Sequence, residues 1–266
     1  MRPKSRNRRV CTYLLILSLL AVVLTGCGSS TTGQGKNTDG ANGKIPQIEG
    51  LTYEKSVDFT YAECLAIYRY EGGYSLVDIF DDARYLIVPE GGSVPENLEE
   101  DITVIRQPVN DIYLGATAVM SLFDAIDGLD HISMTSLKES GWTIENAAAR
   151  MKEGMILYAG KYSEPDYEMI LEKGCQLAIE STMIYHTPDV KEMLEELGVP
   201  VLVDRSSYES NPLGRTEWIK LYGVLTGKET EANAFFEKQQ ETVAAFDDYE
   251  STGKKAAFFY LTTDGK

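Results

Sequence analysis

Histidine, cysteine and basic residues are scarce in this sequence, and each shortage argues against a class of protein. Among 266 residues there are two histidines, His131 and His186, whereas transition-metal sites made of protein side chains usually draw on several His or Cys ligands. Four cysteines are too few for a disulfide scaffold. Lys and Arg number 25 against 41 Asp and Glu, and the net charge of −16 argues against nucleic-acid binding, which needs clustered cations.

The basic residues that are present gather at the N-terminus. Five of them fall in the first nine positions, and no acidic residue occurs before Asp39. An apolar stretch at residues 13–24 follows and is interrupted only by Ser18. A membrane-spanning helix needs about 20 apolar residues, so this stretch is too short. A basic segment before a short apolar one is typical of a secretory signal peptide, here residues 1–26.

The signal segment ends in Leu24-Thr25-Gly26-Cys27, which resembles the lipobox of bacterial lipoproteins. The resemblance implies cleavage after residue 26 and a diacylglycerol on the thiol of Cys27, the strong nucleophile of this segment. An ordinary signal peptide with an incidental cysteine is the alternative. Residues 28–43 consist almost entirely of small and polar residues. We therefore expect residues 27–48 to be a lipidated cysteine and a flexible tether, at the extracytoplasmic face of the cell membrane.

The folded body is expected to begin near residue 49 with strands. Residues 65–70 and 74–80 flank a glycine turn and predict a β-hairpin. Two further apolar runs of strand length follow, at 84–88 and 102–105. Beyond them, two apolar segments that each stop at a glycine predict helices, at 113–126 and 143–153.

Strands and helices then alternate. Apolar runs at 155–158, 176–179 and 199–203 predict three strands, and the segments 165–173 and 188–197 between them predict helices. Each interval has room for one crossover helix, so the strands should be parallel. The fold class is therefore α/β, and residues 49–211 should form an N-terminal lobe that contains a parallel βαβ sheet.

Residues 212–250 are expected to be mainly helical. One helix should start near Pro212 and end at Thr226-Gly227, and a longer one of about 20 residues should reach about Tyr249. Residues 254–261 then predict a strand. We expect residues 251–266 to be the start of a second α/β lobe whose remainder the sequence lacks, with the longer helix as the connection between the lobes.

This topology predicts where a ligand binds. In open parallel sheets, ligands lie beyond the carboxyl ends of the strands. The loops at those three ends contain Tyr162, Tyr185 and Tyr208, with several hydrogen-bonding neighbours. Such side chains suit a binding edge, although each tyrosine could equally be an amphipathic loop residue.

Three segments carry a family resemblance: residues 158–171, residues 178–182, and residues 218–228, which end in Leu-Thr-Gly-Lys. With the lipobox, the tether and the order of lobe and long helix, the chain resembles the cobalamin and ferric-siderophore class of ABC-transporter substrate-binding proteins over about residues 50–266. The resemblance implies a metal chelate (ferric siderophore, haem or cobalamin) held between two lobes and delivered to ABC permease subunits. The absent second lobe departs from this pattern.

The resemblance also implies site residues. The expected ligand-binding residues are Lys161, Tyr162, Thr182, Tyr185, Arg205, Tyr208 and Arg215. Cations and aromatic rings suit a large anionic iron chelate, since arginine can donate two hydrogen bonds to one carboxylate. Arg215 could instead pair with Glu217 or Glu209 on the surface. Glu168 occupies the position of a glutamate that family members present to the permease, and its alternative role is that of a solvated surface carboxylate.

Other classes of protein stay open. A lipid-anchored α/β enzyme is one, but the sequence has no nucleophile elbow, no phosphate-binding glycine-rich loop and no paired-His zinc motif. A surface interaction lipoprotein is another, and a protein that binds bare metal ions would normally need more histidines. We therefore expect a binding protein that is not an enzyme and has no cofactor or metal of its own. Cys64 and Cys175 are either a pair or two buried thiols.

Overall fold

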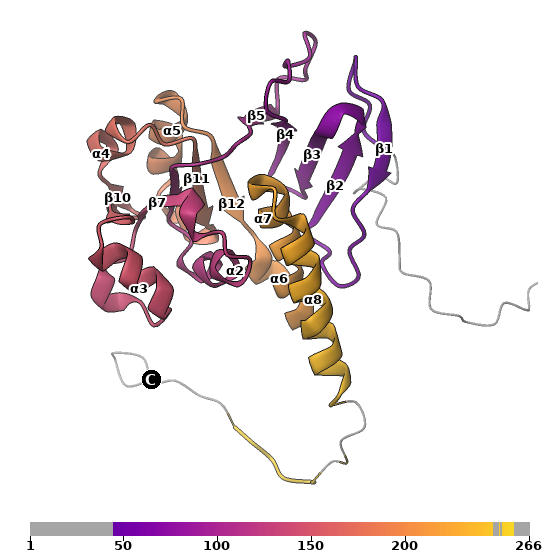
Figure 1. The fold of residues 1–266 in the computed structure, drawn as a ribbon, viewed down its shortest axis with the longest axis vertical. Coiled ribbons are helices and arrows are strands. Elements are labelled where there is room, and N and C mark those ends of the chain that lie inside the picture. The colour runs from indigo at the N-terminus through magenta and orange to yellow at the C-terminus, as the bar shows by residue number, and fades with distance from the viewer. Residues whose placement is uncertain (1–44, 247–249, 251, 258–266) are drawn as a thin grey trace, which may run out of the picture. The chain divides into compact units, whose positions relative to one another are not determined.

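The computed structural model describes residues 45–246, 250 and 252–257 of the chain (Figure 1). The expected signal peptide, Cys27 and most of the tether lie outside these residues. The described part holds two five-stranded sheets, a two-stranded hairpin and helices, so the α/β fold class is confirmed. None of its helices is both long enough and apolar enough to cross a membrane.

The first sheet follows the chain in order, β1-β2-β3-β4-β5. Its strands are β1 (Tyr53–Ser56), β2 (Leu65–Tyr70), β3 (Tyr74–Ile79), β4 (Ala83–Val88) and β5 (Ile102–Arg106). Neighbours are antiparallel except β4 and β5, which are parallel. The predicted hairpin is confirmed as β2 and β3, joined by a turn in which Gly72 and Gly73 have φ of 80° and 87°. Glycine adopts this left-handed region without steric cost.

The second sheet is parallel throughout and has the order β12-β11-β6-β7-β8. Its strands are β6 (Ile112–Leu114), β7 (Ile132–Thr135), β8 (Leu157–Tyr158), β11 (Leu177–Ser181) and β12 (Val201–Asp204). The three predicted parallel strands are present as β8, β11 and β12, but β8 and β11 are not neighbours. The chain builds outward from β6 to β8 and then returns to the other side of β6. The strand order therefore reverses between β6 and β11, which is a topological switch point.

The helix predicted over residues 113–126 is wrong in its first part. Residues 112–114 form the central strand β6, and the helical segment is shorter, comprising the 3-10 helix η2 (Thr117–Val119) and α2 (Met120–Ala125). All three residues of β6 are fully buried. A parallel strand covered on both faces reads as a continuous apolar run, which periodicity cannot distinguish from a buried helix. Strand β7 was not predicted either.

The remaining helices follow the sequence pattern closely. They are α3 (Glu145–Lys152), α4 (Tyr167–Glu172), α5 (Pro188–Glu196), α6 (Pro212–Glu217), α7 (Ile219–Thr226) and α8 (Glu229–Ala244), with 3-10 helices η3 (Leu129–His131), η4 (Glu139–Gly141), η5 (Thr182–His186) and η6 (Ser206–Tyr208). The predicted helix from Pro212 is divided at Trp218, and α8 has 16 residues rather than about 20. Residues 254–257 form no strand, and the rest of the strand predicted there lies outside the described residues.

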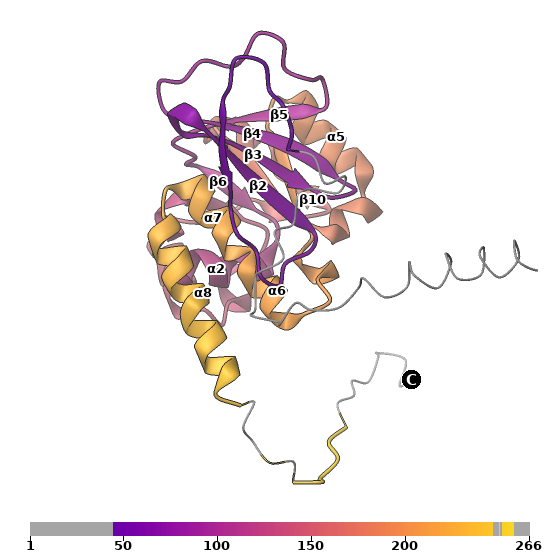
Figure 2. The ribbon, with the colours of Figure 1, turned by 90° about the vertical axis from the view of Figure 1, so that its right-hand side faces the viewer.

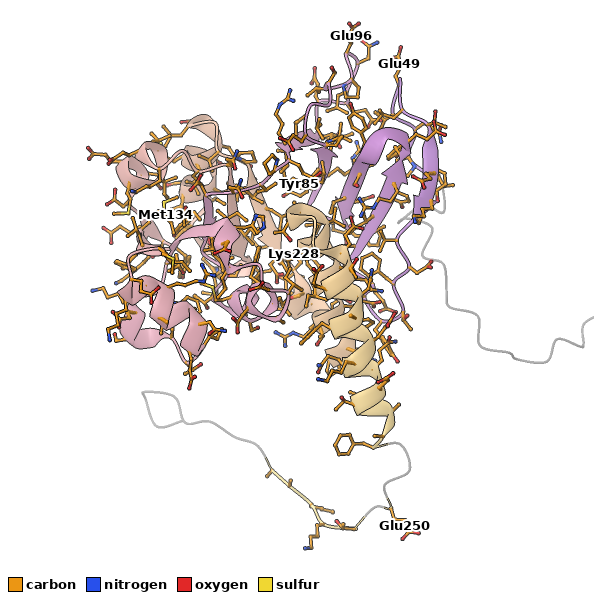
Figure 3. All side chains as sticks on the ribbon, viewed as in Figure 1. Glu49, Tyr85, Glu96, Met134, Lys228 and Glu250 are labelled. Carbon is orange, nitrogen blue, oxygen red and sulfur yellow. The ribbon has the colours of Figure 1, made fainter. Side chains whose placement is uncertain are left out.

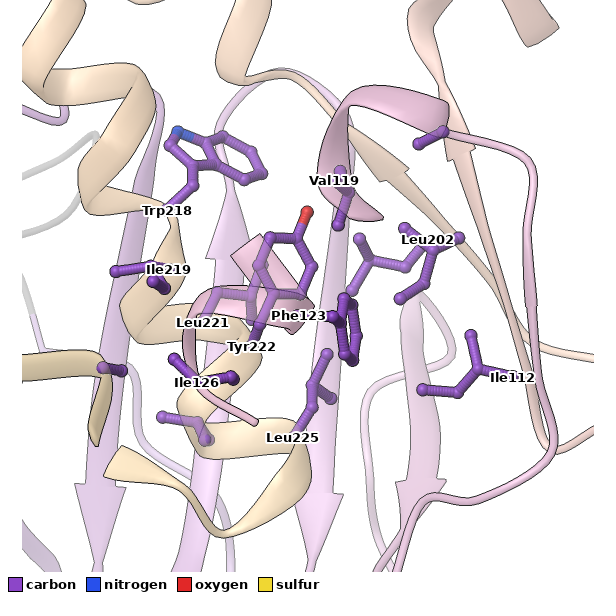
Figure 4. Packing of buried hydrophobic residues seen from close by; sticks show 14 of the residues in the cluster. Ile112, Val119, Phe123, Ile126, Leu202, Trp218, Ile219, Leu221, Tyr222 and Leu225 are labelled. Carbon is purple, nitrogen blue, oxygen red and sulfur yellow. The ribbon is translucent and has the colours of Figure 1, made fainter. Parts of the chain in front are cut away.

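The largest apolar cluster joins one face of the first sheet to the second sheet and to helices α2, α7 and α8. Figure 4 shows its centre, where Tyr222 of α7 lies beside Phe123 of α2, and where Trp218 and Leu202 belong to the same cluster. The ring centroids of Phe123 and Tyr222 are 5.1 Å apart. Helix α8 packs along α6 and α7 (Figure 2). This cluster makes the two sheets parts of one packed structure.

Two buried carboxylates tie the connection between β1 and β2 to the helices. Glu217, which is fully buried, accepts hydrogen bonds from the backbone N–H groups of Thr60, Tyr61 and Ala62 at 2.8–3.0 Å. Glu209 accepts from the N–H groups of Glu63 and Cys64 at 2.7 and 3.0 Å. We call this pair, Glu209 and Glu217, the carboxylate clasp.

The side chains around the clasp complete it. The indole Nε1 of Trp218 donates to Glu209 at 2.8 Å, and Lys220 Nζ donates to Glu217 at 2.7 Å. A Cβ on Gly214 would meet the carbonyl oxygen of Tyr61 at 2.8 Å, so this position of α6 requires glycine. Because five consecutive backbone donors depend on two carboxylates, the clasp should contribute strongly to stability.

We expect Glu217→Gln to lower the free energy of unfolding by about 3–5 kcal/mol, because the amide turns an N–H₂ donor toward backbone donors and removes the charge opposite Lys220. Urea denaturation with linear extrapolation measures this difference. The matched control is Glu192→Gln on the exposed face of α5, where a change within about 0.5 kcal/mol is expected. Equal effects of the two substitutions would contradict the role of the clasp.

Candidate functional site

The carboxyl ends of the parallel strands lie along one edge of the second sheet. We call this edge the rim and define it by the loops that follow the strands, which begin at Gly115, Ser136, Ala159, Thr182 and Arg205. Ligands of open parallel sheets bind at this edge, most often at the switch point. The rim is therefore the candidate binding site, with the ends of β6 and β11 at its centre.

Three of the predicted ligand-binding residues come together at one end of the rim. Arg205 donates from Nη1 to the carbonyl oxygen of Phe80 at 2.7 Å, and its guanidinium carbon lies 5.0 Å from the ring centroid of Tyr208. Tyr185 donates its hydroxyl to Asp82 Oδ1 at 2.7 Å. Burial and then this hydrogen bond raise the pKa of Tyr185. We call Tyr185, Arg205 and Tyr208 the Arg205 cluster.

The Arg205 cluster remains open to solvent although Arg205 Nη1 and the hydroxyl of Tyr185 have hydrogen-bond partners. Tyr185 is 40% exposed and Tyr208 is 53% exposed. Phe80 and Asp82 belong to the connection between β3 and β4, so the first sheet forms one wall of the cluster. The hydroxyl of Tyr85, which Figure 3 labels on β4, donates to the carbonyl oxygen of Val201 at 2.8 Å and joins the two sheets nearby.

Arg215 belongs to α6, and Thr182 belongs to η5, which also contains Tyr185. Arg215 is exposed on α6. It acts electrostatically on Asp204, whose pKa is raised by burial while Arg215 opposes that rise. Within the described residues Arg215 forms no ion pair with Glu209 or Glu217, because the clasp engages both carboxylates elsewhere. Thr182 is half-buried as the first residue of η5.

Lys161 and Tyr162 lie on a different part of the rim. They belong to a short hairpin of β9 (Gly160–Lys161) and β10 (Glu164–Pro165) that precedes α4. Lys161 is exposed and Tyr162 is half-buried. Among the described residues, no hydrogen bond, ion pair or ring contact joins them to the Arg205 cluster. The predicted ligand-binding residues thus form two groups along one edge.

The structure adds a cation and an aromatic ring that were not predicted. Lys138 Nζ lies 5.4 Å from the ring centroid of Tyr158, beyond the ends of β7 and β8. A cation over an aromatic face is a common element of ligand sites. Lys138 was missed because it follows β7, a strand that the sequence pattern did not reveal, whereas the end of β8 was recognised.

A carboxyl group is buried at the centre of the rim. Glu180 is the penultimate residue of β11 and has no exposed surface. Within the described part of the chain, neither of its carboxylate oxygens has a hydrogen-bond partner. Burial raises the pKa of Glu180 to about 8, so the carboxyl is mostly protonated at neutral pH. The sequence placed Glu180 in the second rim loop without distinguishing it from its neighbours.

The described residues hold no group of three or more His, Cys, Asp or Glu side chains arranged for a metal ion. Cys64 and Cys175 are free thiols, and burial raises the pKa of each to about 11.

Glu168 is exposed near the start of α4, where Asp166 caps the helix by accepting from the N–H of Met169 at 3.0 Å.

No protein-family model matches the chain. Among curated proteins, the chain is 25% identical over 249 residues to an uncharacterized lipoprotein of Methanocaldococcus jannaschii. The alignment covers 85% of this chain and 59% of that protein. The chain therefore spans less than two thirds of the length of this relative.

Solved structures resemble parts of the chain. The periplasmic haem-binding protein HutB of Vibrio cholerae matches 54% of this chain and 51% of its own, with 18% identity and a TM-score of 0.43. A periplasmic binding protein from Veillonella parvula matches 53% and 49%, with 15% identity and a TM-score of 0.44. The petrobactin-binding protein YclQ of Bacillus subtilis matches 52% and 46%, with 13% identity and a TM-score of 0.41. Each alignment covers about half of either chain.

Proposed function

We propose that this protein is an extracytoplasmic solute-binding lipoprotein that captures an anionic metal chelate at the rim and delivers it to an ABC permease. The observation that carries the proposal is the Arg205 cluster. It places a cation and two exposed tyrosines at the carboxyl edge of a parallel sheet, beside the switch point. We propose further that the protein binds this ligand without turnover and is not an enzyme.

The chemistry of the Arg205 cluster suits a large anion. The guanidinium is held by the carbonyl oxygen of Phe80 and by the ring of Tyr208, so little side-chain entropy is lost when a ligand binds. Arginine offers further N–H donors in a planar fork that matches carboxylates and catecholates. Lys138, Lys161 and Arg215 add positive charge along the same edge. This supports a ligand that combines negative charge with flat or apolar surface.

We expect a chelate to bind saturably and Arg205→Ala to raise its Kd about 10–150-fold, the loss of one charge-assisted hydrogen bond. The anionic probes for isothermal titration are ferric petrobactin and haemin, and cationic ferrioxamine B and neutral cyanocobalamin test whether negative charge is required. Tyr208→Ala, at a half-exposed ring, should also weaken binding without loss of folding. The control Arg106→Ala removes an exposed arginine at the end of β5. Absence of binding by both anionic probes would overturn the proposal.

The lipid anchor is proposed from the lipobox resemblance and from the lipoprotein relative. We expect cells that express the chain and are fed an alkyne-tagged fatty acid to label it, and Cys27→Ser to abolish both the label and recovery in the membrane fraction. The matched control is Cys11→Ser within the signal segment, which should keep both. Label retained by Cys27→Ser would exclude this residue as the anchor.

Glu168 is proposed to contact the permease. It is exposed near the start of α4, a helix that contains no residue of the Arg205 cluster. We expect Glu168→Ala to abolish uptake of the bound chelate into cells while its Kd stays unchanged. Glu172→Ala, which removes an exposed carboxylate from the end of the same helix, is the control and should transport normally. Loss of ligand affinity in Glu168→Ala would contradict a docking role.

A further inference from the structure

Glu180 occupies an unusual place for an ionisable side chain. It lies on β11 opposite Val203 of β12, one residue beyond the pair that Ile179 forms with Leu114 of β6. It therefore sits near the carboxyl end of β11, one of the two strands of the switch point, two residues before the rim loop that starts at Thr182. Its side chain is fully buried, and neither oxygen has a hydrogen-bond partner in the described part of the chain.

The neighbouring strand leaves room for this carboxyl. A Cβ built on Gly115, which follows β6, would overlap the carboxylate of Glu180. Gly115 has no positive φ that would require glycine for the backbone. The absence of a side chain at residue 115 therefore makes space for Glu180, and the two residues form a matched pair across the switch point.

The groups around the carboxyl are tyrosines rather than cations. Burial raises the pKa of Tyr113 of β6 and of Tyr167 of α4, and the charge of Glu180 raises both further. Tyr158 of β8 and Cys175 also raise the pKa of Tyr113. From α5, Asp189 faces Tyr167. The pKa of Glu180 is raised by burial alone. An ionised Glu180 would thus be a buried charge without compensation, which is strongly unfavourable.

We infer that Glu180 is a positioning residue of the rim, and that its proton must be present for the loops beginning at Gly115 and Thr182 to keep their closed arrangement. The next residue toward the carboxyl edge, Ser181, is already half-exposed. Ionisation therefore favours an opening of this edge. The inference deepens the proposed function, since it makes the binding site responsive to pH.

Backbone hydrogen bonds report this opening. The N–H groups of Gly115 and Ala116 both donate to the carbonyl oxygen of Ile179 at 2.9 Å, and Ser136 Oγ donates to the carbonyl oxygen of Gly115 at 3.1 Å. These contacts join the ends of β6, β7 and β11. Hydrogen exchange of the two amides, corrected for intrinsic base catalysis, measures how often the edge opens.

The sign of the pH effect follows from the two pKa values. In the open edge Glu180 titrates near its ordinary value of 4.5, and in the closed edge near 8. The closed edge thus binds one more proton than the open edge between these two values. The stability that this proton gives to the closed edge is fully present below pH 4.5 and is lost as the pH rises to 8. We expect the opening constant at Gly115 and Ala116 to rise about tenfold per pH unit between 5 and 8 and then to level off.

Glu180→Gln tests the assignment, because glutamine resembles the protonated carboxyl and does not titrate. We expect this variant to lack the tenfold rise, whereas Glu192→Gln on exposed α5 should keep it. In the wild-type protein, one side-chain carboxyl carbon of ¹³C-labelled glutamate should titrate near pH 8. The inference would be overturned if the opening constant at Gly115 and Ala116 rose equally with pH in Glu180→Gln and in the wild-type protein. It would also be overturned if Glu180 titrated near its ordinary value in the folded protein.

The pairing with Gly115 has an independent test. Gly115→Ala should raise the unfolding constant at least 100-fold in the wild-type background and less than 10-fold in Glu180→Ala, where the carboxylate is gone. Equal effects in both backgrounds would contradict the paired arrangement. None of these measurements needs a ligand, so they test the role of Glu180 even if no chelate binds. If they fail, the proposal that the rim binds a chelate still stands.

Discussion

Five consecutive backbone N–H groups, those of residues 60–64, find their acceptors on two carboxylates contributed from the other end of the folded chain. The segment that carries them connects β1 to β2 and has no strand of its own to pair with. Without Glu209 and Glu217, these donors, of which the N–H of Ala62 is buried and the others are partly buried, would lose their acceptors, which is destabilising. The carboxylate clasp therefore fixes the first sheet against α6 and α7, and the remaining packing depends on that placement.

The candidate site is a consequence of this placement. Once the first sheet is held against the helices, its connection between β3 and β4 reaches the carboxyl edge of the second sheet. There the carbonyl oxygen of Phe80 orients Arg205, and Asp82 orients Tyr185. The second sheet alone would present both as free surface side chains. The position of the guanidinium at the rim thus depends on both sheets, because Arg205 follows a strand of the second sheet and its acceptor on Phe80 follows a strand of the first.

The sequence predicted what depends on local pattern and missed what depends on long-range contact. Glycine turns and apolar runs located most elements, and the α/β class followed from the alternation of strands and helices. Strand β6 was assigned to a helix because burial on both faces removes periodicity. Glu209 and Glu217 were considered only as surface partners of Arg215, since a sequence shows charge but not burial. Lys138 could not be placed because its strand was not recognised.

The buried carboxylates show how surroundings decide the behaviour of one functional group. The clasp supplies each of its carboxylates with several N–H donors, so the charged form is satisfied and the contact is rigid. Glu180 has no donor within the described chain and is surrounded by tyrosines and apolar side chains. Burial without donors favours the neutral form. The fold thereby uses glutamate carboxyl groups in two ways. Glu209 and Glu217 attach the first sheet to the helices, whereas Glu180 makes the centre of the rim depend on a proton.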